Sequence, residues 1–97
     1  MNNIQQIKSK LSHLKKQLVA EFHIKEIGVF GSYVRNEQTN KSDLDVLVDF
    51  SEYPGMFQFV KMENFLSEQL GIKVDLVIKS ALKPNIGKKI LSEVEML

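Results

Sequence analysis

Two aspartates stand at alternate positions of one short segment, Asp43 and Asp45 in DLDVLVDF. Leu44, Val46 and Val48 alternate with them, a pattern that predicts a strand buried on one face. Residues two apart in a strand face the same way and lie roughly 6.6 Å apart, so these two carboxylates project side by side. Neighbouring carboxylates repel each other, and the usual outcome is a raised pKa or a cation bound between them.

A third carboxylate is expected from a neighbouring strand. Asp75 is the only acid in the apolar segment IKVDLVI, whereas Asp49 lies too far along its strand to share an ion with Asp45. Three converging carboxylates favour a hard cation such as Mg²⁺, which completes its coordination shell with water and phosphate oxygens. The plain alternative is that Asp43 caps a loop, Asp45 is solvated and Asp75 pairs with a base such as Lys73.

An anion site is expected a short distance upstream of the paired aspartates. Gly31 and Ser32 follow the apolar segment EIGVF, and Ser32 is a good N-cap for one or two helical turns in YVRNE. Free backbone N–H groups point outward at such a helix start, glycine allows close approach, and Arg35 can reach the same anion with two donors. Alone, this is more often an ordinary capped turn. Beside the aspartates, it predicts a site for a nucleoside triphosphate and Mg²⁺.

The elements that position these residues follow from hydrophobic periodicity. We expect helices over about 3–22, 56–70 and 85–93, a short helical segment after Ser32, and strands over 26–30, 43–50 and 72–78. Gly71 ends the helix that precedes the third strand. This order predicts one α/β domain spanning 1–97, with a small mixed β-sheet flanked by helices.

The composition excludes several classes of protein. A net charge of +1 argues against a surface that coats nucleic acid, so we expect no direct nucleic-acid partner. The chain has no cysteine, which excludes disulfides, a thiol nucleophile and thiolate metal sites. It has no apolar run that could span a bilayer and no signal-peptide core, so we expect a cytoplasmic protein with no membrane contact.

The stretch GSYVRNEQTNKSDLD resembles the signature of polymerase-β-type nucleotidyltransferases: Gly-Ser, ten residues, then Asp-x-Asp. Nearly the whole chain, including KVDLVI and the tail ALKPNIGKKIL, is similar to the minimal nucleotidyltransferases, the MNT antitoxin partners of HEPN-domain toxins. One departure is Asn36, where many relatives have glycine. Asparagine tolerates the left-handed backbone conformation, so we expect the turn to be kept.

The resemblance implies a role for each candidate residue. Three acids would hold two Mg²⁺ ions: Asp43, Asp45 and Asp75. Asp75 would also help to draw the proton from the attacking hydroxyl. The upstream turn would hold the outer phosphates of ATP through Gly31, Ser32 and Arg35. The implied reaction transfers AMP from ATP to a tyrosine hydroxyl of a partner HEPN ribonuclease toxin, with release of pyrophosphate, within a hetero-oligomer.

Two other functions compete with this one. The chain could be a non-catalytic antitoxin that neutralises the HEPN partner by occlusion, with a residual nucleotide site. It could instead modify a small molecule or an RNA end, but relatives with such acceptors carry a second domain, which this chain lacks. The apolar surplus on 56–70, which includes Phe57 and Phe59, could form the partner interface, although most of it is better explained as cover for the sheet.

Overall fold

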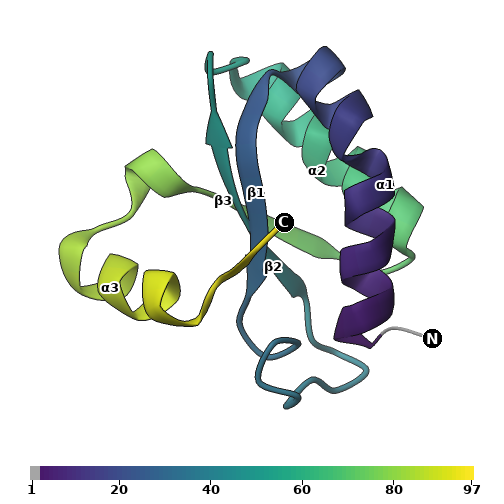
Figure 1. The fold of residues 1–97 in the computed structure, drawn as a ribbon, viewed down its shortest axis with the longest axis vertical. Coiled ribbons are helices and arrows are strands. Elements are labelled where there is room, and N and C mark those ends of the chain that lie inside the picture. The colour runs from purple at the N-terminus through teal and green to yellow at the C-terminus, as the bar shows by residue number, and fades with distance from the viewer. Residues whose placement is uncertain (1–2) are drawn as a thin grey trace.

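A four-stranded mixed sheet organises the chain, with α1 and α2 on one side and α3 on the other (Figure 1). The computed structural model describes residues 3–97. Its elements, in chain order, are α1 (Ile4–Phe22), β1 (Ile24–Phe30), β2 (Leu44–Phe50), α2 (Met56–Leu70), β3 (Val74–Ile78), the 3₁₀ turn η1 (Lys79–Ala81), α3 (Pro84–Glu93) and β4 (Glu95–Met96). The predicted α/β class, with a small mixed sheet flanked by helices, is confirmed.

The strand order is β3-β2-β1-β4, so β2 occupies the interior of the sheet as its apolar pattern predicts. β1 runs antiparallel to both β2 and β4, whereas β2 and β3 are parallel. Parallel neighbours need a crossover connection, and α2 supplies it between β2 and β3. The parallel pairing matters for function because it places the same end of β2 and of β3 at one edge of the sheet.

The hydrophobic core lies between the sheet and the helix pair α1 and α2. Leu44, Val46 and Val48 are fully buried in it, which confirms the predicted apolar face of β2. The α1 stripe contributes Leu11 and Leu18, both without solvent exposure, so the reading of this stripe as core is also confirmed. Because one face of β2 packs into the core, the residues that alternate with these three project from the opposite face.

Two details differ from the sequence-based expectation. Residues 31–36 form consecutive turns rather than a helix. Arg35 N–H bonds to the Gly31 carbonyl at 3.2 Å, but Asn36 then takes a left-handed φ of 60° and ends the helical path after one turn. Asn36 thus keeps the turn, as expected. The second difference is β4, which two residues are too short to reveal in a sequence, and which forms because β1 has a free edge.

The outer edge of β3 is closed by two side chains of α2. Glu63 Oε2 accepts the Leu76 N–H at 2.9 Å, and Ser67 Oγ accepts the Val74 N–H at 3.0 Å. These bonds satisfy backbone donors that an edge strand otherwise leaves open. They also fix the height of β3 along α2, and therefore the position of Asp75, which lies between the two bonded residues.

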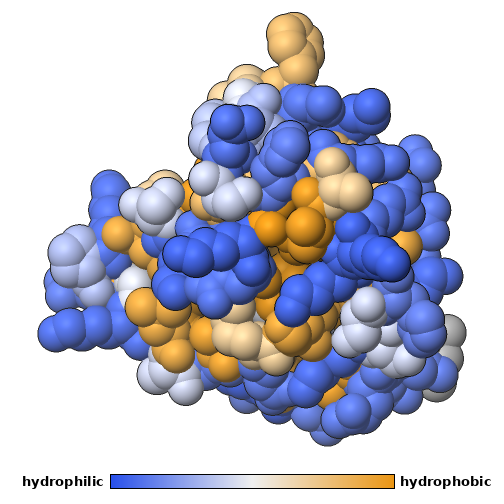
Figure 2. Space-filling view, turned by 45° about the horizontal axis from the view of Figure 1, so that its top comes forward, coloured by the Kyte–Doolittle hydropathy of each residue, from blue (hydrophilic) through white to orange (hydrophobic). Residues whose placement is uncertain are grey.

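Large apolar side chains remain exposed in several places, which include Val19 on α1 and Met96 on β4. Four lie at or just before the start of α2: Tyr53, Met56, Phe57 and Val60. Two more, Ile86 and Leu91, lie on α3. One face of the molecule shows such apolar areas among a mostly hydrophilic surface (Figure 2). Within residues 3–97, no helix is long and apolar enough to cross a bilayer.

Gly28→Ala should detach β4 from β1. A Cβ at Gly28 would lie 2.6 Å from Met96 Sδ and 2.9 Å from the Glu95 carbonyl oxygen, and the second is backbone that can move only with the strand. We expect a loss of about 1–3 kcal/mol in the free energy of unfolding, measured in urea. Amide exchange should show lost protection at Leu97, whose N–H bonds to the Ile27 carbonyl at 2.9 Å. Unchanged protection there would contradict this account.

Candidate active site

The three predicted acids lie at one edge of the sheet. Asp45 in β2 is the direct register partner of Asp75 in β3, and Asp43 is one residue before β2 begins. Their side chains belong to the face turned away from α1 and α2, because the intervening Leu44 and Leu76 are buried in the core. Asp43 and Asp45 are half-buried and Asp75 is exposed. The expected third acid from a neighbouring strand is therefore in place.

This arrangement makes the ionised form of Asp45 less favourable. Burial, followed by the negative charges of Asp75 and Asp43, raises the pKa of Asp45 from 3.8 to about 6. A divalent cation would offset this repulsion, and three carboxylates form the hard oxygen donor set that Mg²⁺ prefers. Within residues 3–97, however, no three acidic or His side chains are gathered into a formed metal cluster. The donor chemistry fits Mg²⁺, but the side chains have to turn inward to bind it.

Gly31 joins the acids to the upstream turn. Its φ is +84°, and a Cβ built on it would overlap Asp45 Oδ2, so the Asp45 carboxylate lies directly against the Gly31 α-carbon. Among the described residues, no acceptor receives the backbone N–H of Ser32 or Tyr33. Two successive free N–H groups beside the Ser32 hydroxyl form the kind of backbone concavity that binds phosphate. Within the described part of the chain, the turn therefore keeps two unbonded N–H donors even without the predicted helix, and its role as an anion site stays a prediction.

Arg35 and the Gly31 N–H bind the same anionic group, which is the side-chain carboxylate of Glu93. Glu93 Oε2 accepts the Gly31 N–H at 2.8 Å, and both Glu93 oxygens accept from Arg35 Nη1 at 2.9 and 3.0 Å. Arg35 Nε donates to Glu37 at 2.9 Å. Partial burial acts to raise the pKa of Glu93, but the Arg35 guanidinium and the Gly31 N–H hold that pKa below its ordinary value. Sequence reasoning missed Glu93, because an acid at the end of a polar helix carries no distinguishing signal.

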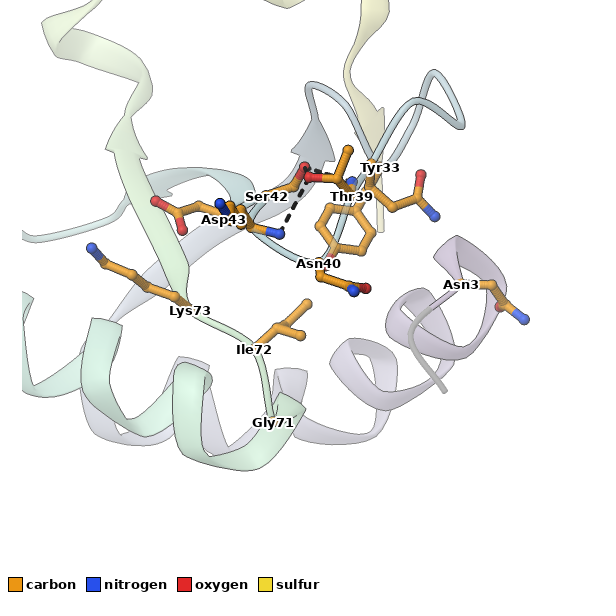
Figure 3. A pocket seen from close by; sticks show the side chains of 11 residues that line it. Asn3, Tyr33, Thr39, Asn40, Ser42, Asp43, Gly71, Ile72 and Lys73 are labelled. Carbon is orange, nitrogen blue, oxygen red and sulfur yellow. Dashed lines mark hydrogen bonds between the residues drawn. The ribbon is translucent and has the colours of Figure 1, made fainter.

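A pocket of about 720 Å³ opens beside the acids. The loop over 38–43 forms one wall with Tyr33 beside it, and Ile72 and Lys73 lie across from them (Figure 3). Thr39 N–H bonds to Ser42 Oγ at 2.8 Å, so the ten-residue spacer is an ordered loop. Asp43 and Tyr33 line the pocket, while Asp45, Asp75, Gly31 and Ser32 do not. Tyr33 is only 5% exposed, which favours the packing role over free stacking on a base.

Asp45→Asn should stabilise the metal-free chain near neutral pH. A carboxyl with a raised folded-state pKa costs stability wherever it is ionised, above about pH 6, and costs nothing below its unfolded value of 3.8. After discounting for solvent screening, we expect a gain of roughly 1–2 kcal/mol at pH 8 that disappears below about pH 4. Urea unfolding across this pH range, with EDTA present, measures it. Asp49→Asn, on the same strand, is the control, and an equal gain there would refute the account.

Gly31→Ala should cost more than backbone strain alone. Gly71 has a similar positive φ of +69° with no atom within 4 Å of a built Cβ, so Gly71→Ala measures the strain by itself. Gly31→Ala adds the overlap with Asp45, and we expect a further loss of about 1–3 kcal/mol in the free energy of unfolding. That extra loss should shrink in an Asp45→Gly background. Equal costs at the two glycines would show that Asp45 does not press on Gly31.

Known proteins resemble this chain along nearly its whole length. The family model for the nucleotidyltransferase domain matches residues 6–97. The protein adenylyltransferase MntA of Thermococcus cleftensis is 49% identical over 94 residues, covering 97% of this chain and 95% of that protein. A solved structure described as a minimal nucleotidyltransferase aligns with a TM-score of 0.82 at 28% identity, covering 99% of this chain and 97% of that one.

A more distant structure shares the fold. It is the complex of a tri-AMPylated HEPN toxin of Shewanella oneidensis with MNT antitoxin, which aligns with a TM-score of 0.69 at 18% identity and covers 93% of this chain and 70% of that one. Together with the juxtaposed acids and Gly-Ser turn, the family match and the close relative settle the classification. This chain belongs to the nucleotidyltransferase-domain family, and within it to the minimal, MNT-type nucleotidyltransferases.

Proposed function

We propose that this protein is a Mg²⁺-dependent protein adenylyltransferase that acts as an antitoxin, transferring AMP from ATP to a tyrosine hydroxyl of a partner HEPN toxin. The observation that carries the proposal is the contact between the Asp45 carboxylate and Gly31. This contact places carboxylates that can bind a cation next to a turn whose N–H groups can bind phosphate. The 49% identity to a protein adenylyltransferase supports AMP as the transferred group. The fold shared with an MNT antitoxin supports the choice of partner.

The acids would act on both the nucleotide and the acceptor. Asp43 and Asp45, with Asp75, would hold two Mg²⁺ ions, which supply charge neutralisation for the triphosphate and the leaving pyrophosphate. Asp75 is the most exposed of the three, so it is the one that an acceptor hydroxyl can approach from solvent. In the reaction the acceptor oxygen bonds to the α-phosphorus, the bond from that phosphorus to the bridging oxygen breaks, pyrophosphate leaves, and the hydroxyl proton passes to Asp75.

The turn would bind the outer phosphates. The Ser32 hydroxyl and the N–H groups of Ser32 and Tyr33 are the available donors, and the glycine before them allows close approach. Arg35 uses Nε and Nη1 for Glu37 and Glu93, so within residues 3–97 its Nη2 is left for a phosphate oxygen. This assignment keeps the predicted phosphate role of Arg35 but confines it to one edge of the guanidinium.

The start of α2 is the proposed surface for the partner. Phe57 is 94% exposed and is accompanied by Met56, Tyr53 and Val60. Phe59, by contrast, packs against the core, so only one of the two aromatics that the sequence suggested is free for a partner. An exposed aromatic of this size in a polar surface is typical of a protein interface.

The second candidate function is neutralisation by binding alone. It is favoured by the separation of the two surfaces, since α2 covers the face of the sheet opposite the three acids. A toxin held at Phe57 could be occluded without any use of the nucleotide site. The two functions therefore differ in whether the acids are needed for neutralisation.

Loss of the acids decides between the two functions. The chain is incubated with labelled ATP, Mg²⁺ and a candidate HEPN-domain partner protein, and both proteins are analysed by intact mass. We expect AMP on the partner, with Asp43→Ala and Asp45→Asn each slowing transfer by about a hundredfold or more, and Asp49→Asn transferring normally. The toxin's ribonuclease activity is measured in parallel. If no AMP is transferred while all variants still neutralise the toxin, binding alone is the function.

A further inference from the structure

We infer that Glu93 is a positioning residue for the phosphate-binding turn, and that it ties the C-terminal segment to nucleotide binding. The inference rests on the proposed function only for the identity of the ligand as a nucleoside triphosphate. Glu93 is the last residue of α3 and lies 62 positions from Gly31 in the sequence. Its side chain is 21% exposed; its bond to the Gly31 N–H is partly buried, whereas its bonds to Arg35 are exposed to solvent.

Glu93 determines which N–H groups of the turn are left for a ligand. It accepts the Gly31 N–H at 2.8 Å and so fixes the orientation of that peptide. The next two N–H groups, of Ser32 and Tyr33, receive no acceptor from residues 3–97. A phosphate can therefore bind the turn without displacing Glu93.

Arg35 makes this arrangement compatible with an anionic ligand. A bare carboxylate beside a triphosphate would repel it, but Arg35 Nη1 bonds to both Glu93 oxygens at 2.9 and 3.0 Å. The pair contributes little net charge, and the carboxylate holds the guanidinium close to the turn. Glu93 therefore orients two predicted phosphate ligands at once, the backbone of the turn and Arg35.

The residues after Glu93 hold it in place. Lys8 of α1 bonds to Glu95 at 2.8 Å, and the Leu97 N–H bonds to the Ile27 carbonyl at 2.9 Å. The C-terminal strand β4 thus forms the outer edge of the sheet beside β1 (Figure 1). Glu93 ends α3 just before this anchored strand, so the pairing of β4 with the sheet limits how far Glu93 can move from the turn.

A competing assignment has the opposite consequence. If Glu93 occupied the phosphate position itself, ATP would have to expel it, and removal of its charge would tighten nucleotide binding. If Glu93 positions the turn, removal weakens binding. We infer the second assignment because the N–H groups of Ser32 and Tyr33, which a phosphate would need, have no acceptor among residues 3–97 while Glu93 is bonded to Gly31.

The test uses the full chain with Glu93→Gln and Glu93→Ala, and Glu95→Gln as the matched control. Glu95→Gln removes a negative charge from the same C-terminal segment, but its amide oxygen can still accept from Lys8 and the backbone pairing of β4 remains, so Glu93 keeps its place. Binding of ATP with Mg²⁺ is measured by calorimetry, and the Gly31 amide by ¹H–¹⁵N NMR. We expect Glu93→Ala to weaken ATP binding about tenfold or more, Glu93→Gln to weaken it less, and both to shift the Gly31 amide proton upfield. Glu95→Gln should change neither.

Each other outcome has a distinct meaning. Tighter ATP binding by Glu93→Gln, or unchanged affinity and an unchanged Gly31 amide in both variants, overturns the inference. An equal loss of affinity in Glu95→Gln also overturns it, because the effect would then follow from any loss of negative charge in the C-terminal segment. A native chain that shows the expected binding series but transfers no AMP leaves the role of Glu93 intact and refutes the proposed function instead.

Discussion

The in-register pairing of Asp45 with Asp75 on parallel neighbouring strands is the constraint around which the rest of this structure is arranged. Partial burial of Asp45, together with repulsion from Asp75 and Asp43 beside it, raises the pKa of Asp45 to about 6. The opposite face of the same strands supplies the stability that tolerates this repulsion, since Leu44, Val46 and Leu76 are buried against the helices. Two hydrogen bonds from α2 hold β3 in that register. The same pair of strands therefore packs into the core with one face and presents the acids of the site on the other.

Within the site, negatively charged groups and hydrogen-bond donors lie on different sides of a short boundary. Carboxylates lie on the strand side, N–H donors lie on the turn side, and Gly31 is the point where the two meet without an intervening side chain. Two carboxylates on the donor side, Glu93 and Glu37, both bond to Arg35. This separation suits a ligand that carries its own cations at one end and bare phosphate oxygens at the other, which is how a triphosphate binds with Mg²⁺.

The exposed aromatic residues at the start of α2 and the three acids lie on opposite faces of the sheet, which constrains how the proposed partner would reach the acids. A toxin bound over Phe57 at α2 does not by itself bring a hydroxyl to the acids. It must extend around the edge of the sheet, or a second toxin copy must present the hydroxyl. An assembly with more than one contact between the proteins meets this requirement, which agrees with the hetero-oligomer implied by the family resemblance.

The sequence by itself determined the local elements and the candidate ligands. Alternation at 43–50 identified the buried strand and its acids, and Gly31-Ser32 at a strand end identified the turn, because both signals depend on residues close together in the chain. The sequence also predicted a helical segment after Ser32, but the left-handed conformation of Asn36 ends the helical path after one turn. Only the tertiary structure decided that Asp45 presses on Gly31, that Glu93 bonds to the turn, and that β4 exists. Those features depend on contacts between distant segments, and such contacts are set by how the layers pack.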